Sequence, residues 1–243
     1  MIQGAVRSRV AQKLSHGAPL TDEDRRRLDE VTRSTRDFEP RGEIISEGDR
    51  PDDVHFITEG YACRYKIVPD GGRQIMAWLA PGDACDLHVS ILGEMDHSIA
   101  ALSPCKVAFV PRRTIDELME GSPAITRAFW WATLVDEGIL REWLVSMGRR
   151  PADRQVAHLF CELLTRLQAV GLAEDNMLEL PVTQAELADT TGLSAVHVNR
   201  VIHQLRHDQL ISLHGKRLTI HDPDRLKAFA QFDPLYLHLP PRS

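Results

Sequence analysis

The chain has 243 residues, a length that suits one large domain or two smaller ones. Hydrophobic residues make up 43% and charged residues 26%, values typical of a globular protein, which exclude wholesale disorder. The formal net charge of −6 argues against a protein that binds nucleic acid over its whole surface, but it allows a local basic face.

The sequence indicates neither a membrane protein nor a disulfide-rich secreted one. The longest apolar run extends from Ala128 to Val135 and contains Thr133, whereas a membrane span needs about 20 residues. Residues 1–7 lack the apolar segment of a signal peptide. The cysteines show no C-x-x-C spacing and no disulfide framework: Cys63, Cys85, Cys105 and Cys161. We therefore expect a cytoplasmic protein.

Residues 1–40 are polar and favour helix. Thr21 and Asp24 have the spacing of a capping box, which predicts the start of a helix. The run Arg25-Arg26-Arg27 that follows is typical of a solvated helix face.

Between Arg41 and Pro111 the pattern changes to short β runs separated by glycine-containing turns. Asp70-Gly71-Gly72 is a strong hairpin signal, because glycine adopts positive φ without steric cost. Many short strands with turn signals indicate a sandwich, barrel or β-roll and not a βαβ sheet. Strands are predicted over residues 43–46, 53–58, 61–68, 74–79, 98–102 and 106–110.

A long helix is predicted from Pro123 to Gly148, with Ser122 as its cap. Its apolar residues cover more than one face, so the helix must be buried on two sides. One side can pack on the β domain. The other side needs a partner, which is either the same helix of a second copy or another part of the same chain. After Pro151 a further amphipathic helix is predicted, and the tail from Asp233 to Ser243 is expected to be extended.

The segment from Thr183 to Leu205 is the most informative about function. Thr183 and Glu186 form a second capping box, Gly192 permits a tight turn, and Ser194 caps the next helix. This spacing is that of a helix-turn-helix, whose second helix presents its N-terminal residues to the DNA major groove. The buried stripe of that helix is predicted at Val198, Val201, Ile202 and Leu205.

A β-hairpin with a basic tip, predicted over residues 210–220, completes a winged helix. Residues 194–221 carry four basic side chains against Asp208, although residues 151–243 as a whole are slightly acidic. Arg200 can donate two hydrogen bonds to guanine, the alternatives being a phosphate contact or a local ion pair. The other predicted DNA contacts are Asn199 and His197 on base edges or phosphate, Arg206, Lys216 and Arg217 on phosphate, and Thr183, Ser194 and Ala195 at the helix starts.

A glycine-punctuated β-roll, a long helix and a C-terminal winged helix, in that order, resemble the Crp/Fnr family of bacterial transcription regulators. The resemblance covers roughly residues 20–225. Besides the winged helix, its anchors are residues 42–49 (GEIISEGD), 54–60 (VHFITEG) and 81–83 (PGD).

The resemblance implies an α+β fold with three parts. These are a cyclic-nucleotide-binding-like β-roll with N-terminal helices over residues 1–121, a dimerisation helix over 122–148 and a winged helix-turn-helix domain over 149–243. It also implies a homodimer that reads an inverted repeat through the helix 194–206, with half-sites about one helical turn, ~34 Å, apart. A signal at the β-roll would reorient the DNA-binding domains, and an activator would also touch RNA polymerase.

The effector pocket departs from that of the cyclic-nucleotide-binding members. Their ribose-binding Gly-Glu pair is replaced by Cys85-Asp86-Leu87, which is one residue short, although Asp86 could still accept from a ribose hydroxyl. Their phosphate-clamping Arg is replaced by His97, which cannot form a two-pronged phosphate contact. We therefore expect no cyclic-AMP binding of the usual kind. The candidate pocket residues are Asp83, Cys85, Asp86, Leu87, His97 and Ser98.

No cofactor is assigned from the sequence. The iron–sulfur members carry an N-terminal cysteine cluster, but residues 1–62 contain no cysteine, so that cluster is not expected. A metal or haem site could use Cys85, His88 and His97, with His55 as a further ligand. Such residues are more often structural, and no metal site is predicted. Val196 stands where many family members have Glu, so a different base preference is expected.

The sequence thus predicts a homodimeric DNA-binding regulator with an altered effector pocket. The alternative is a small-molecule, metal or redox sensing module whose winged helix contacts a protein, and replacement of Arg200 would distinguish the two. No enzyme is expected, because G-x-x-x-x-G-K-[ST] and H-E-x-x-H are absent and no Ser-His-Asp arrangement is evident.

Overall fold

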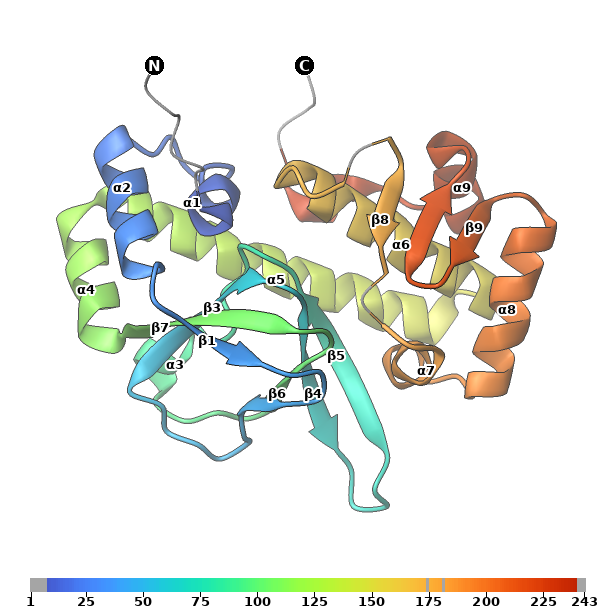
Figure 1. Cartoon of the computed structure of the whole chain (residues 1–243), viewed down its shortest axis with the longest axis horizontal. Helices are drawn as coiled ribbons and strands as arrows, with labels where there is room; N and C mark the ends of the chain where they lie inside the picture. The colour runs from blue at the N-terminus through green and yellow to red at the C-terminus, as the bar shows by residue number, and fades with distance from the viewer. Residues whose placement is uncertain (1–7, 174, 181, 240–243) are drawn as a thin grey trace. The chain divides into compact units, whose positions relative to one another are not determined.

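The computed structural model (Figure 1) describes residues 8–173, 175–180 and 182–239. The chain divides into two units: Met1–Arg64 with Trp78–Leu134, and Tyr65–Ala77 with Val135–Ser243. The expectation about a signal peptide falls on residues 1–7, outside the described ranges, and the three-part boundaries given above stay predictions. Within the described ranges, no helix combines the length and the apolar character that crossing a membrane requires.

The β-roll consists of two sheets. The first has the strand order β1-β7-β3 and the second β2-β6-β4-β5. The predicted strands are confirmed to within two residues at each end, because glycine turns delimit them. Their bounds are β2 Glu43–Ile45, β3 Asp53–Glu59, β4 Ala62–Ile67, β5 Arg73–Leu79, β6 Ser98–Ala101 and β7 Cys105–Pro111.

Strand β1, Thr35–Phe38, was not predicted from the sequence. None of its residues is fully buried, so it lacks the alternation that marks a half-buried strand. It forms through backbone pairing with β7, in which Arg36 lies opposite Val107. Tertiary pairing therefore created a strand that local pattern did not encode.

The core of the first unit lies between the β-roll and its helices. Strand β7 lies between β1 and β3, and Val54 and Phe56 of β3 pair with Val110 and Ala108. The helices are α1 (Arg9–Leu14), α2 (Asp22–Val31), the short α3 (Val89–Leu92), α4 (Arg112–Gly121) and the start of α5 (Pro123–Arg149). They contribute Val10, Leu14, Leu28, Val89, Ile115, Leu118, Ile125 and Phe129 to the core.

The sequence predicted the start of α2 but not the start of α4. The capping box of α2 is confirmed: Asp24 N–H donates to Thr21 Oγ1 at 3.1 Å and Thr21 N–H donates to Asp24 Oδ2 at 2.9 Å. Helix α4 was not predicted, because Pro111 precedes it and no side chain caps its first turn.

The second unit is arranged around α6, Ala152–Ala169, which contacts α7, α8 and α9. Its sheet has the order β8-β10-β9 and is antiparallel. The remaining elements are β8 Met177–Glu179, α7 Gln184–Thr191, α8 Ala195–His207, β9 Ile211–His214, β10 Arg217–Ile220 and α9 Pro223–Ala230.

The expectation of an extended tail was wrong for Pro234–Leu237, which form the 3-10 helix η1. Asp233 caps this turn by accepting from Leu235 N–H at 3.0 Å. The turn is ordered by tertiary contacts, since Leu237 is buried and Tyr236 reaches α6. Residues 240–243 of the tail lie outside the described ranges.

A buried carboxylate joins three elements of the second unit. Glu162 of α6 accepts hydrogen bonds from Trp143 Nε1 of α5 at 2.9 Å and from Tyr236 Oη of η1 at 2.8 Å. Arg166 forms an ion pair with it, one helical turn away. Burial raises the pKa of Glu162, which the cation and these donors partly offset.

The turn at Gly60 provides a test of the β-roll geometry. Gly60 has φ +74°, and an added Cβ would lie 2.0 Å from the backbone oxygen of Pro104. Gly71 has φ +87° with open space around it, so Gly71→Ala is a matched control. We expect Gly71→Ala to cost about 1–2 kcal/mol from backbone strain alone. Gly60→Ala should cost about 1–3 kcal/mol more, because backbone must move.

The measurement is the urea midpoint of unfolding for each variant. Equal midpoints for the two variants would contradict the close approach of Gly60 to Pro104.

Candidate nucleic-acid interface

The helix-turn-helix is built from α7, α8 and the turn between them. Thr183 and Glu186 form the predicted capping box, with Thr183 N–H donating to Glu186 Oε2 at 2.7 Å. Helix α7 ends at Gly192, whose φ of +69° is left-handed and whose N–H donates to Ala188 O. Ser194 then caps α8 by accepting from His197 N–H at 3.2 Å. These capping hydrogen bonds and the left-handed glycine fix where each helix begins and where α7 ends.

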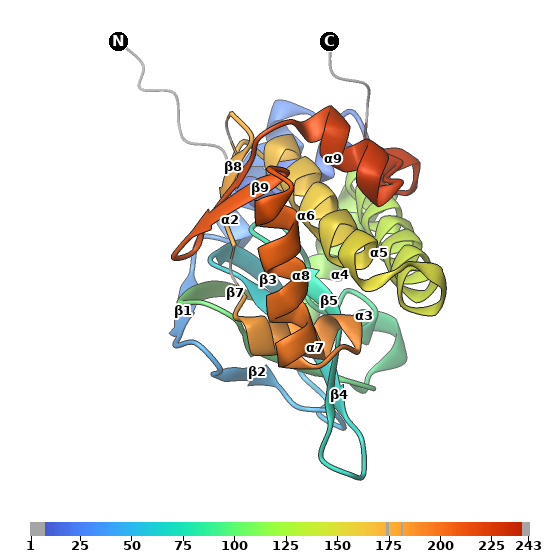
Figure 2. The ribbon, with the colours of Figure 1, turned by 90° about the vertical axis from the view of Figure 1, so that its right-hand side faces the viewer.

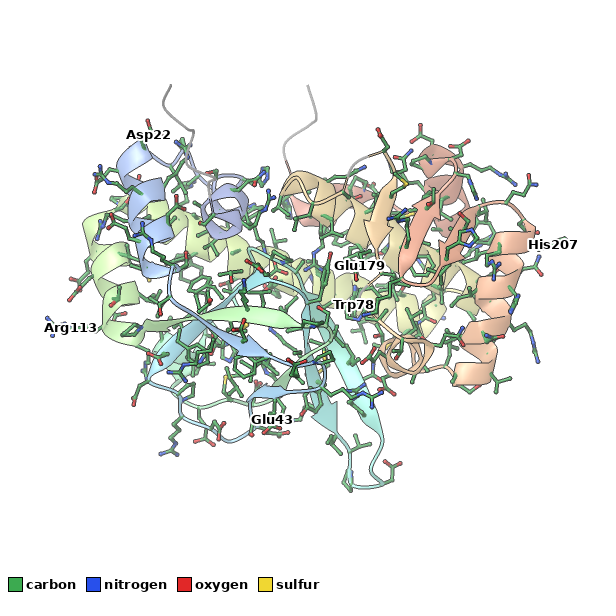
Figure 3. The ribbon with its side chains drawn as sticks, in the orientation of Figure 1. Asp22, Glu43, Trp78, Arg113, Glu179 and His207 are labelled. Atoms are coloured by element: carbon green, nitrogen blue, oxygen red, sulfur yellow. The ribbon has the colours of Figure 1, made fainter. Side chains whose placement is uncertain are left out.

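The two faces of α8 have different environments. Its predicted stripe is buried: Val198, Val201, Ile202 and Leu205. On the outer face, Val196 is 72% exposed, and Arg200 and His203 follow it at helical spacing. Figure 2 shows α8 at the surface of the second unit, with α7 at its start and β9 beyond its end. Figure 3 shows His207 projecting outward from the last turn.

The β9–β10 hairpin forms the wing. Gly215, with φ +61°, makes the turn, and Lys216 and Arg217 are exposed beside it. Strand β8, not foreseen from sequence, extends the sheet by pairing Glu179 with Arg217. Four cations are exposed and form no ion pair with any other residue that the structure describes: Arg200, Arg206, Lys216 and Arg217.

The predicted contact residues do not all have free side chains. Asn199 donates from Nδ2 to Gln184 Oε1 at 3.0 Å, so it is held by α7. The Thr183 and Ser194 hydroxyls accept capping hydrogen bonds. Ala195 and His197 are exposed beside them. Sequence reasoning did not assign Gln184 and His203, which share this surface with Val196, the residue expected to alter the base preference. The available signal was that they fall outside the buried stripes.

The predicted effector pocket has most of its polar groups engaged within the protein. Asp83 is paired with Lys13 and accepts from Ala80 N–H at 2.8 Å. Asp86 is fully buried and accepts from His55 N–H at 2.8 Å and from His55 Nδ1 at 2.7 Å. Both carboxylates are thus engaged by other residues of the chain.

Apart from His97, the remaining pocket residues are also bonded to, or packed against, other parts of the chain. Ser98 Oγ accepts from Glu47 N–H at 2.9 Å, Leu87 packs against the core, and Cys85 is fully buried. The exception is His97, which is 8% exposed and has its Nδ1 2.6 Å from Asp96 Oδ1, while its Nε2 has no hydrogen-bond partner in the part of the chain that the structure describes.

Of the four candidate metal ligands, the structure brings two together. His88 and His97 have ring centroids 5.5 Å apart and form a cluster with Asp96, whereas Cys85 and His55 are not in that group. Burial lowers the pKa of both clustered histidines, and the hydrogen bond from His97 lowers the pKa of Asp96.

All four cysteines are buried, and none of them forms a disulfide with another described cysteine. Burial raises the pKa of Cys105 and of Cys161 to about 12, and the pKa of Cys85 also lies well above its usual range. A thiol reacts through its thiolate, so burial and the raised pKa disfavour reaction at Cys85, Cys105 and Cys161.

Comparison with known proteins matches both parts of the chain. Residues 35–122 match the cyclic nucleotide-binding domain, and residues 154–229 match the Crp-like helix-turn-helix domain. The chain is 30% identical over 188 residues to the nitrogen fixation regulation protein FixK of Bradyrhizobium diazoefficiens, covering 77% of this chain and 78% of that relative. It is 29% identical over 190 residues to the transcriptional activator protein FnrL of Cereibacter sphaeroides, covering 76% and 75%.

Solved structures share the fold. FixK2 from Bradyrhizobium japonicum superposes with a TM-score of 0.72 at 23% identity, covering 80% of this chain and 96% of that one. At this identity the likeness concerns the fold alone, and the contact residues named above stay predictions.

The buried thiols generate a labelling prediction. At pH 8 a thiol with a pKa of about 12 has about one thiolate in 10⁴ molecules. We expect iodoacetamide to modify the native chain at least about 100 times more slowly than the urea-unfolded chain, in which all four cysteines react. Mass spectrometry of the alkylated protein measures this, and fast modification of any one cysteine in the native state would contradict it.

Proposed function

The chain belongs to the Crp/Fnr family of DNA-binding transcription regulators, and on that premise we propose that it binds an inverted-repeat DNA site as a homodimer. Each copy would place α8 in the major groove and its wing on the neighbouring phosphates. The proposal rests chiefly on one observation: the outer face of α8 and the wing carry exposed cations that pair with no other described residue.

The contacts divide by chemistry. Arg200, at the outer face of α8, can donate two hydrogen bonds to guanine O6 and N7. Val196 is apolar and exposed in the first turn, so it suits a thymine methyl group. Arg206, Lys216 and Arg217 suit phosphates, which supply affinity and salt dependence without base discrimination.

A second copy is the occupant we propose for the outer face of α5. Trp130, Leu134 and Leu144 are 59%, 52% and 67% exposed. Glu137 and Arg141 lie between them on the same helix and form an ion pair with each other. The five positions 130, 134, 137, 141 and 144 follow one another at intervals of four, three, four and three residues. This is the spacing of a coiled-coil seam, so two α5 helices can pack face to face.

We further propose that cyclic AMP is not bound in the usual way. A cyclic phosphate needs a cation with directed donors, and His97 at that place is a buried imidazole whose Nδ1 is committed to Asp96. The ribose-binding acid is likewise committed, since Asp86 is bonded to His55.

The DNA-binding proposal predicts distinct effects for two substitutions. Genomic fragments selected by the purified protein without effector supply the site for fluorescence-anisotropy titration. Arg200→Ala should weaken specific binding by about 1–3 kcal/mol and relax selectivity at one base pair. Lys216→Ala should lower the salt slope by about one without changing selectivity.

The control for these variants is Arg113→Ala on α4, where the side chain is 90% exposed and projects outward (Figure 3). Full DNA binding by Arg200→Ala would favour the alternative in which the winged helix contacts a protein.

The dimer proposal predicts a change of mass in solution. We expect the wild type at micromolar concentration to sediment at twice 27.4 kDa. Leu134→Lys combined with Leu144→Lys should give the single-chain mass, because lysines facing each other across the seam repel and lose apolar burial. Leu235→Lys is the control, since Leu235 is 74% exposed but lies on η1. A monomeric wild type, or a dimeric double variant, would rule out this seam.

A further inference from the structure

We infer that His88 and His97, with Asp96 supporting His97, form a binding site for a divalent transition-metal ion such as Zn²⁺. One candidate ligand atom from each side chain lies within 4.8 Å of those of the other two. This inference is independent of the DNA-binding proposal, because it concerns a property of the β-roll that can be measured without DNA.

The two imidazoles carry the argument. Nε2 of His88 and Nε2 of His97 are both buried, and neither has a hydrogen-bond partner among the described residues. A buried polar atom without a partner is costly, and native interiors rarely keep one without a reason. Here two such atoms belong to rings only 5.5 Å apart. A metal ion between them would satisfy both lone pairs at once.

Asp96 sets the orientation and tautomer of His97. Its Oδ1 lies 2.6 Å from His97 Nδ1, so that nitrogen donates its proton and Nε2 keeps a free lone pair. A carboxylate that holds the far nitrogen of an imidazole is the usual support for a metal-ligating histidine. Asp96 therefore supports the site from the far side of the His97 ring and does not itself contact the ion.

The backbone around the cluster is anchored on both sides of the site. Leu92 N–H donates to His88 O at 2.8 Å, and Gly93 ends α3 in a left-handed conformation. Met95 is 2% exposed and exchanges backbone hydrogen bonds with the 48–49 turn. A Zn–N distance of about 2.0–2.1 Å places two ligand nitrogens about 3.3 Å apart. The ring centroids are 5.5 Å apart, a separation at which rotation of the two side chains can bring one nitrogen of each ring to that distance.

The charge and access of the site suit a cation. The Arg64 guanidinium is close enough to act on both histidines, but its donors are committed to the Ala84 and Cys85 carbonyls. The carboxylates of Asp86 and Asp96 oppose its charge at His88. The Asp96 side chain is 85% exposed, so it also gives an ion a path from solvent.

The donor set selects the class of ion. Two imidazoles favour Zn²⁺, Ni²⁺, Co²⁺ or Cu²⁺ over Mg²⁺ and Ca²⁺, which prefer all-oxygen sites. Two protein ligands leave the other coordination positions open for water or a small anion.

The test is a Zn²⁺ titration of the metal-stripped full-length protein against a chromophoric chelator. We expect one Zn²⁺ per chain, with binding at least about 100-fold weaker in His88→Gln combined with His97→Gln. Asp96→Asn should weaken binding about 10–100-fold, because it keeps the shape but loses the charge that supports His97. His221→Gln, on an exposed histidine outside the cluster, should bind as the wild type does.

Two measurements make the result decisive. Urea unfolding of each variant establishes that lost binding is not lost folding, and Asp96→Asn is the variant least able to disturb the core. Co²⁺ bound at the site should give visible absorption unlike that of the hydrated ion. The inference is overturned if wild type and double variant bind Zn²⁺ equally, or if the Co²⁺ spectrum is that of the hydrated ion. DNA binding by the metal-stripped wild type, measured separately, tests the proposed function alone.

Discussion

The structure depends most on the burial requirement of α5. A 27-residue helix with apolar side chains on several sides must be covered along more than one face. In the first unit Ile125, Ala128 and Phe129 enter the core of the β-roll. In the second unit Trp143 is 3% exposed and donates to the buried carboxylate of Glu162. These contacts leave Trp130, Leu134 and Leu144 of α5 exposed. The proposed dimer would bury these apolar side chains.

The β-roll keeps the family's frame, and two carboxylates of its candidate pocket are bonded inward, Asp83 to Lys13 and Asp86 to His55. The proposal that cyclic AMP is not bound in the usual way rests on this pairing and on His97. Two imidazole nitrogens of the same region differ from these carboxylates: Nε2 of His88 and Nε2 of His97 are buried and have no hydrogen-bond partner among the described residues. They are the ligand atoms of the inferred metal site.

Helix α8 has one face that stabilises the fold and another that carries the proposed DNA contacts. Its buried stripe packs on the neighbouring helices, and its caps satisfy backbone donors at each start. The outward residues make few intramolecular contacts, so they can change without loss of the fold. An exposed residue such as Val196 can therefore be replaced while the helix-turn-helix geometry is kept.

The sequence by itself determined the order of elements and the class of protein. Glycine turns delimited the strands, capping boxes at Thr21 and Thr183 located helix starts, and Gly192 with Ser194 located the helix-turn-helix. These features are local, because φ preferences and capping bonds act over a few residues. Contact residues on α8 could be chosen from helical periodicity, although the bond of Asn199 to Gln184 could not be foreseen.

Only the tertiary structure decided what depends on distant partners. Strand β1 exists through pairing with β7, and η1 exists because Tyr236 reaches Glu162, 74 positions away. The cluster of His88, Asp96 and His97 arises from a loop that folds back through its contact with the 48–49 turn. Residue type showed that these histidines could bind a metal. Whether their nitrogens are buried together and unpaired is a property of the packed fold, because burial and hydrogen-bond satisfaction depend on what the rest of the chain places around them.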